Sequence, residues 1–156
     1  MPDRVVETTV QEVLEEVVGA LGLKGTIEVD RDGEVVTGTV HGDDLGLFIG
    51  RHGQTIDAVQ HIVFRIALTR GAGDEGDLRV VIDAEGYRAR RAEALQRVAD
   101  QAAEDVRRYG RPVALDAMTA SERKLVHEYL RDRGDVETYS EGEEPDRHLV
   151  VAPLVA

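Results

Sequence analysis

Apolar residues recur along the chain with two spacings, and the switch between them predicts an α+β protein. Apolar positions three and four apart, with polar residues between them, predict helices over residues 5–21, about 54–70, 86–109 and about 119–132. Alternation or β-branched runs between turn residues predict strands over residues 26–30, 34–41, 78–84, 136–140 and 147–152. A short helix at "DDLGLFI", opened by acidic capping residues, and a short strand at "VALDA" complete the set.

The first three strands have a predictable order. Asp32-Gly33 lies between the first two strands and is a strong hairpin signal, so these strands should be antiparallel. Two helices separate the second strand from the third. A connection of that length is a crossover, which returns the third strand parallel to the second. The N-terminal half of the chain therefore predicts the order α-β-β-α-α-β.

A long helix begins the second half, and Gly110 and Pro112 end it. No Pro/Ser-rich linker or long repeat separates the two halves. We therefore expect two small domains, residues 1–85 and residues 86–156, with the long helix belonging to the second. The residues expected on the inward face of that helix are Ala89, Ala92, Leu95, Val98, Ala99, Ala102, Ala103 and Val106.

Composition narrows the class of protein. The 156 residues include no cysteine, which excludes disulfides and thiolate metal sites. No secretory or membrane-length apolar run is found, so we expect a cytoplasmic protein. The net charge of −12 is unevenly distributed, with acidic ends and a basic middle, and residues 79–111 alone hold eight arginines against six acidic residues. A polyanion is therefore expected to bind with modest, salt-sensitive affinity.

The stretch "LFIGRHGQTIDAV" contains a Gly-x-x-Gly sequence at residues 50–53. The spacing itself is uninformative, because it also occurs at residues 19–22, 22–25 and 73–76. Residues 50–53 differ from these because a predicted helix lies on each side and the middle is cationic, Arg51-His52. Glycines allow close approach of a phosphodiester backbone, and the start of a helix presents free N–H groups to it.

The order of elements, with "IGRHGQTI" at the joint between two helices, resembles a type II KH domain. In KH domains this loop clamps the backbone of about four single-stranded nucleotides. The resemblance implies that the bases lie in a groove lined by Ile49, Ile56 and the neighbouring strand. The RNA-binding residues that it implies in the loop are Gly50, Arg51, His52 and Gly53.

A second motif lies in "SERKLVHEYL", where Arg123 and His127 are four residues apart on one helix face. The spacing, with the Ser-x-Gly turn and basic strand that follow it, resembles R-three-H domains, small modules that bind single-stranded nucleic acid. It implies a second phosphate-binding patch of Arg123, His127 and Arg147, with Lys124 at its rim and His148 on the same side. An isolated Arg-x-x-x-His would instead be read as a solvated helix face whose arginine pairs with a neighbouring glutamate.

A KH domain followed directly by an R-three-H domain resembles the bacterial Jag family, also called KhpB or SpoIIIJ-associated proteins. The resemblance implies a single-stranded RNA-binding protein, an RNA chaperone or post-transcriptional regulator linked to cell growth and division. It also implies a small single-KH partner of the KhpA kind. Many members begin with an extra N-terminal Jag domain, whereas this sequence starts at the KH helix.

An enzyme and a protein-binding scaffold are the two classes of function that compete with RNA binding. Ser121 and His127 are six apart on one predicted helix and point to different sides, and the histidines at 41, 52 and 61 lie on separate elements. We therefore expect no enzyme, no metal site and no cofactor. The serious alternative to RNA binding is a degenerate KH/R-three-H scaffold that binds protein through the sheet edge or the long helix.

Overall fold

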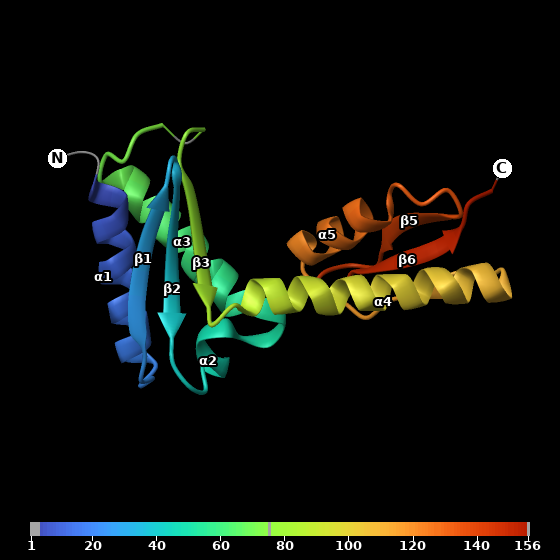
Figure 1. The fold of residues 1–156 in the computed structure, drawn as a ribbon, viewed down its shortest axis with the longest axis horizontal. Coiled ribbons are helices and arrows are strands. Elements are labelled where there is room, and N and C mark those ends of the chain that lie inside the picture. The colour runs from blue at the N-terminus through green and yellow to red at the C-terminus, as the bar shows by residue number, and fades with distance from the viewer. Residues whose placement is uncertain (1–3, 75, 156) are drawn as a thin grey trace. The chain divides into compact units, whose positions relative to one another are not determined.

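The computed structural model describes residues 4–74 and 76–155 and is an α+β protein, as predicted. The chain forms two compact units, the N-terminal unit Met1–Tyr87 and the C-terminal unit Arg88–Ala156. The elements of the N-terminal unit are α1 (Val5–Ala20), β1 (Thr26–Asp32), β2 (Val35–His41), α2 (Gly46–Ile49), the 3₁₀ turn η2 (Arg51–Gly53), α3 (Gln54–Thr69) and β3 (Arg79–Ala84) (Figure 1).

The N-terminal unit has one three-stranded sheet in the order β1-β2-β3. β1 pairs antiparallel with β2, and β3 pairs parallel with β2, so both predicted pairings are confirmed. Asp32 is still paired with Val35, which places the hairpin turn at Gly33-Glu34, one residue later than predicted. Gly33 has φ +61°, a value that favours glycine at this turn position.

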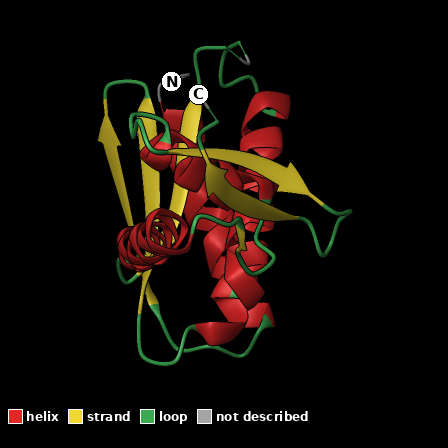
Figure 2. Ribbon diagram, turned by 90° about the vertical axis from the view of Figure 1, so that its right-hand side faces the viewer, coloured by secondary structure: helices red, strands yellow, loops and turns green. Residues whose placement is uncertain are grey.

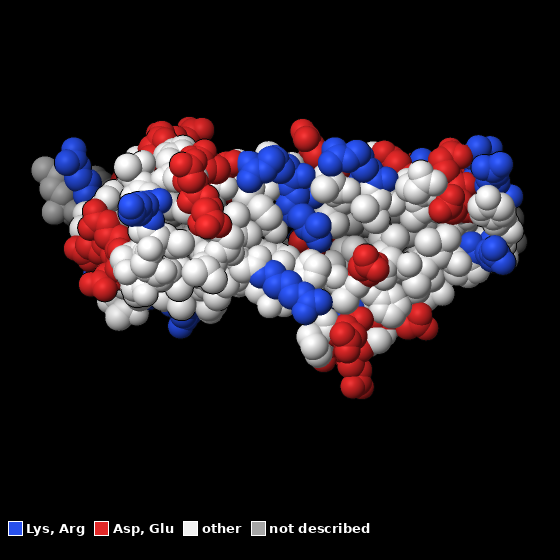
Figure 3. Space-filling view, turned by 90° about the horizontal axis from the view of Figure 1, so that it is seen from below, with Lys and Arg blue, Asp and Glu red and all other residues white. Residues whose placement is uncertain are grey.

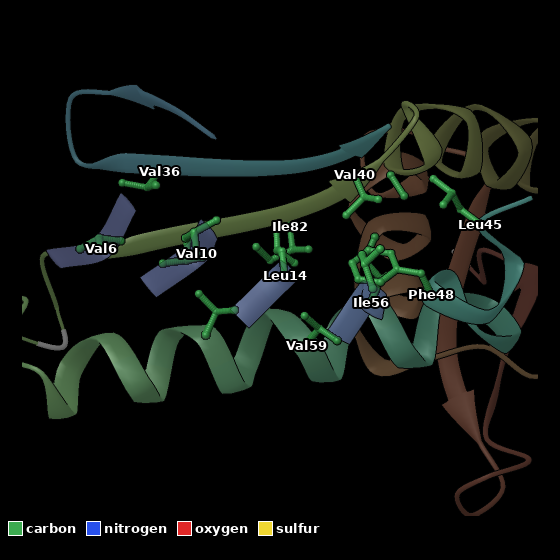
Figure 4. Close-up of a cluster of buried hydrophobic side chains, with 14 residues drawn as sticks. Val6, Val10, Leu14, Val36, Val40, Leu45, Phe48, Ile56, Val59 and Ile82 are labelled. Atoms are coloured by element: carbon green, nitrogen blue, oxygen red, sulfur yellow. The ribbon is translucent and has the colours of Figure 1, made fainter. Parts of the chain in front are cut away.

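Helices α1 and α3 pack side by side on one face of this sheet (Figures 1 and 2). Gly38 in β2 permits the close approach of α1, because a side chain there would collide with Val10 and would place its Cβ 2.8 Å from Leu14 Cδ1. Figure 4 shows the resulting core, which both helices and the strands supply. Its buried side chains include Val6, Val10, Leu14, Val36, Val40, Phe48, Ile56, Val59 and Ile82.

The opposite face of the sheet carries polar side chains. Alternation along β1 exposes Glu28, Asp30 and Asp32 on this face, and their partners on β2 include Thr37 and Thr39. Carboxylates therefore line the outer edge of this sheet face. A phosphate backbone is repelled there, so a polyanion must approach the N-terminal unit elsewhere.

The C-terminal unit contains α4 (Tyr87–Tyr109), β4 (Val113–Ala114), α5 (Ala120–Leu130), β5 (Val136–Glu141) and β6 (His148–Pro153). Its antiparallel sheet has the order β4-β6-β5. Thr119 is the N-cap of α5, and its hydroxyl accepts a 3.3 Å hydrogen bond from the backbone N–H of Glu122. The core joins α4, α5 and the strands through Leu95, Ala99, Ala102, Ala103, Val106, Val126, Leu130, Leu149 and Val151.

Two local expectations are wrong. Ala89 and Val98 are exposed, because the apolar stripe of α4 is narrower than predicted and these residues lie at its edges. Helix α2 has Leu45 as its N-cap, with no capping side chain, so the acidic cap is absent there. Asp44 instead adopts φ +52° in the turn before the helix.

His41, at the end of β2, lies between two carboxylates. Its Nε2 is 2.7 Å from Glu28 Oε2, and its Nδ1 is 3.4 Å from Glu85 Oε1. Glu85 also accepts a 2.9 Å hydrogen bond from the Gly42 backbone N–H. The hydrogen bond to Glu28 and the negative charge of both carboxylates raise the pKa of His41 above its ordinary value.

A raised histidine pKa predicts a pH-dependent contribution to stability. The contribution is complete below the unfolded-state pKa of about 6.5 and is lost as the pH rises through the higher folded-state pKa. Glu28→Gln should lower the pKa of His41, measured by NMR titration. His41→Gln should make the urea denaturation midpoint depend less on pH over this range. Glu16→Gln on α1 is the control, and a His41 pKa that is unchanged in Glu28→Gln would contradict the assignment.

Candidate nucleic-acid interface

The joint between α2 and α3 has an unusual backbone. Gly50 has φ +75° and ψ 175°, a region that essentially only glycine occupies. His52 (φ +56°, ψ 23°) and Gly53 (φ +76°, ψ 16°) are both left-handed. Three of four successive residues thus have positive φ, and the chain reverses between the two helices within this short segment.

Gly50 is required by the protein's own packing, and Gly53 lies close to a neighbouring side chain. A Cβ on Gly50 would lie 2.8 Å from the Thr55 backbone nitrogen and from Thr55 Cβ, and closer still to Thr55 Oγ1. A Cβ on Gly53 would lie 3.0 Å from the hydroxyl oxygen of Tyr87. The two glycines therefore maintain the shape of the loop, whether or not a ligand is bound.

Arg51 and His52 lie at the tip of this joint. Arg51 is exposed and His52 is half-buried. Across residues 4–74 and 76–155, we find no hydrogen bond or ion pair made by either side chain. The 16-residue helix α3 begins directly after them, and its N-cap Gly53 contributes no capping side chain. The positive end of a helix and two uncommitted basic side chains together form an arrangement that attracts an anion.

The apolar residues beside the loop differ from the prediction. Ile56 has no exposed surface and packs in the core with Val59 and Val63, so its expected place in a base-binding groove is wrong. Ile49 is half-buried against the same core. Leu47, three residues before Gly50, is 65% exposed and is the most exposed apolar side chain that we find at this joint. Sequence reasoning missed it, because Leu47 and Phe48 are adjacent in one apolar run and only the packing decides which is buried.

The Arg-x-x-x-His pair on α5 is divided between the interior and the surface. The Arg123 side chain is 10% exposed, and its guanidinium donates to the Met118 carbonyl at 2.6 Å and to Glu144 at 2.7 Å. His127 is exposed and hydrogen-bonded to Thr138. The two residues therefore do not present one shared cationic face, contrary to the helical-spacing argument.

Arg123 instead helps to hold in place the segment that carries Arg147. The backbone N–H of Met118 donates to the Arg147 carbonyl at 3.3 Å, so Arg123, Met118 and Arg147 are linked in series. Arg147 is half-buried and donates to the Gly142 carbonyl at 2.6 Å. Lys124, 75% exposed, lies 4.0 Å from Glu128. The basic groups that reach solvent on this unit near the motif therefore include Lys124, His127 and Arg147, with Arg131 at the end of α5.

Charge over the surface is locally mixed. Figure 3 shows acidic side chains gathered over the N-terminal unit and several basic side chains on the C-terminal unit. Among residues 4–74 and 76–155, no group of His, Asp and Glu side chains is arranged to hold a metal ion. No helix in the described part of the chain has the length and apolarity needed to cross a membrane.

Comparison with known families identifies the N-terminal half of the chain. A family model described as the KH domain of KhpA/KhpB matches residues 7–84, which is half of the chain. The chain belongs to the KhpA/KhpB KH-domain family. An R-three-H domain model matches residues 93–153, so this KhpA/KhpB family member carries the two domains in the predicted order.

Curated relatives of this KhpA/KhpB family member carry the name RNA-binding protein KhpB. The Clostridium symbiosum protein is 36% identical over 143 residues, covering 90% of this chain and 63% of that protein. The Lactiplantibacillus plantarum protein is 39% identical over 136 residues (87% and 41%), and the Bacillus subtilis protein is 33% identical over 141 residues (89% and 66%). The chain thus spans less than two thirds of the length of each of these relatives.

The geometry of the loop predicts the effect of adding a single methyl group. Gly50→Ala should lower the free energy of unfolding by roughly 1–3 kcal/mol, because it combines a forbidden φ/ψ pair with a collision against Thr55. Gly46→Ala is the matched control, because a Cβ there meets nothing within 4 Å. Equal urea midpoints for the two variants would show that the loop does not hold this conformation.

The burial of Arg123 makes a second prediction. Arg123→Ala should cost about 1–3 kcal/mol of unfolding free energy, because the buried Met118 carbonyl loses its partner. Lys124→Ala, which removes the same charge from the next residue of α5, should change stability by less than about 0.5 kcal/mol. Thermal or urea unfolding checks both variants. Similar losses of unfolding free energy in the two would show that the buried contacts of Arg123 do not stabilise this unit.

Proposed function

We propose that this chain binds single-stranded RNA, with the loop Gly50–Gly53 as its main phosphate contact. The observation that carries the proposal is the pair Arg51 and His52, held without intramolecular partners among the described residues on a loop that opens directly into α3. The names of the curated KhpB relatives support the same ligand. Gly50 and Gly53 allow the RNA backbone to approach, and Ile49 and Leu47 offer apolar surface to a base.

The C-terminal unit supplies a second contact in this proposal. Lys124, His127 and Arg147 meet phosphate, and Arg123 acts through the chain as the residue that positions Arg147. The domain division near residue 85 then separates two RNA-contacting domains. We further propose a small single-KH protein of the KhpA kind as partner, because the matching family model is shared by KhpA and KhpB.

Affinity should be modest in this proposal. The net charge of −12 opposes the approach of a polyanion. The exposed carboxylates Glu28, Asp30 and Asp32 on the outer sheet face repel it as well. Binding then depends on a few phosphate contacts, so the affinity should fall as salt is added, with a shallow slope because few counterions are released. A degenerate scaffold, by contrast, predicts no measurable retention of RNA at moderate salt but a stable protein partner.

Reversing the charge of the loop tests the proposal. Arg51→Asp with His52→Asp should weaken binding of a fluorescein-labelled single-stranded RNA by about tenfold or more in low salt, measured by anisotropy. The matched control is Lys24→Asp with His61→Asp, two exposed sites of the same unit at which the same change of formal charge is made. The control should stay within about threefold of the parent. Equal affinity of the folded loop variant and the parent would remove the loop from the interface.

A further inference from the structure

The C-terminal end of α4 presents an aromatic ring between two arginines. Tyr109, the last residue of the helix, is 58% exposed. The guanidinium carbon of Arg108 lies 5.6 Å from the centre of its ring, and that of Arg111 lies 5.8 Å from the same point. Gly110 has φ +70°, and this left-handed residue ends the helix and turns the chain so that Arg111 returns to the ring.

Several arginines of this unit form ion pairs with acidic side chains. Arg91 pairs with Glu122, Arg107 with Glu104, Arg123 with Glu144 and Arg133 with Asp135. By contrast, within residues 4–74 and 76–155 neither Arg108 nor Arg111 makes an ion pair or side-chain hydrogen bond. Their charges are therefore available to a ligand, in a unit that otherwise neutralises many of its own cations.

The other exposed tyrosines of the described residues, Tyr129 and Tyr139, are not in such surroundings. Phe48 is buried, and the hydroxyl of Tyr129 donates to Asp100 at 2.9 Å. Tyr139 on β5 is 46% exposed, but Glu137 and Glu141 lie two residues away on the same face of the strand. Among the exposed tyrosines, Tyr109 is thus the one flanked by unpaired cations.

An exposed ring with adjacent cations is the combination by which proteins hold unpaired nucleotides. Bases stack on aromatic rings whatever their sequence, while arginines meet the phosphates on either side. We propose that Tyr109, Arg108 and Arg111 form a further contact for single-stranded RNA, in which one base stacks on the Tyr109 ring. The proposal rests on the RNA-binding function proposed above and adds a base contact to the phosphate contacts.

A stacking role is tested by removing the ring and, separately, the base. Tyr109→Leu keeps apolar bulk but removes the ring, and should weaken binding of a short labelled single-stranded oligoadenylate by about fivefold or more. It should leave binding of an abasic oligonucleotide of the same length within about twofold, because that ligand has no base to stack. Tyr109→Phe keeps the ring and should stay near the parent for both ligands. Tyr139→Leu is the control at an exposed tyrosine in acidic surroundings.

The contribution of the two arginines is measured by the salt dependence of binding. Arg108→Gln with Arg111→Gln should reduce the slope of log Kd against log salt, because fewer phosphates are neutralised. Unfolding midpoints of every variant establish that it is folded at the assay temperature. If Tyr109→Leu is unfolded there, Tyr109→Gln, which also removes the ring at this exposed site, replaces it in the comparison of the two ligands.

Several outcomes would overturn the inference. Parent-like affinity of Tyr109→Leu for oligoadenylate, or an equal loss on the abasic ligand, would show that no base stacks on this ring. If the loop variant at Arg51 and His52 loses affinity while Tyr109→Leu does not, the proposed function stands and this inference alone fails. If the parent binds neither ligand, both fail. An acidic peptide bound more tightly than RNA in the same assay would assign the arginines to a protein partner instead.

Discussion

The N-terminal unit depends on one backbone constraint, the conformation of Gly50. Its φ and ψ exclude any other residue, and Thr55 fills the space where a side chain would project. This tight joint reverses the chain between α2 and α3, so that Phe48 before it and Ile56 after it reach the same core (Figure 4). Arg51 and His52, which lie between those two anchors, are left at the surface. The core and the candidate RNA contact thus arise from one turn.

Electrostatics then determine what this turn can bind. The protein is acidic overall, and many of its arginines are neutralised by carboxylates of their own unit. Among the described residues, the uncommitted basic groups include two small clusters, at the loop Gly50–Gly53 and at the end of α4. Under the proposed function, such a surface would contact RNA at a few separate points, and each contact would contribute modest affinity.

Features with a local cause were predictable from the sequence. The Asp32-Gly33 signal determined the hairpin to within one residue, and two helices between strands implied the parallel return of β3. The burial of Arg123 was not predictable, because its partner Glu144 lies 21 residues away across a loop. Helical spacing placed Arg123 and His127 on one face but could not indicate which of them would be covered. The Tyr109 cluster was missed because the turn at Gly110 brings Arg111 to the ring.

The central claim is that the joint between α2 and α3 contacts RNA. Chemical-shift mapping of backbone amides during titration with single-stranded RNA tests it most directly, because it locates the contact without altering the protein. The account predicts the largest shifts at Gly50–Gly53 and the first turn of α3, with little change at Glu28 and Asp30 on the outer sheet face. Shifts that spare the loop, or that centre on the acidic face, would contradict it.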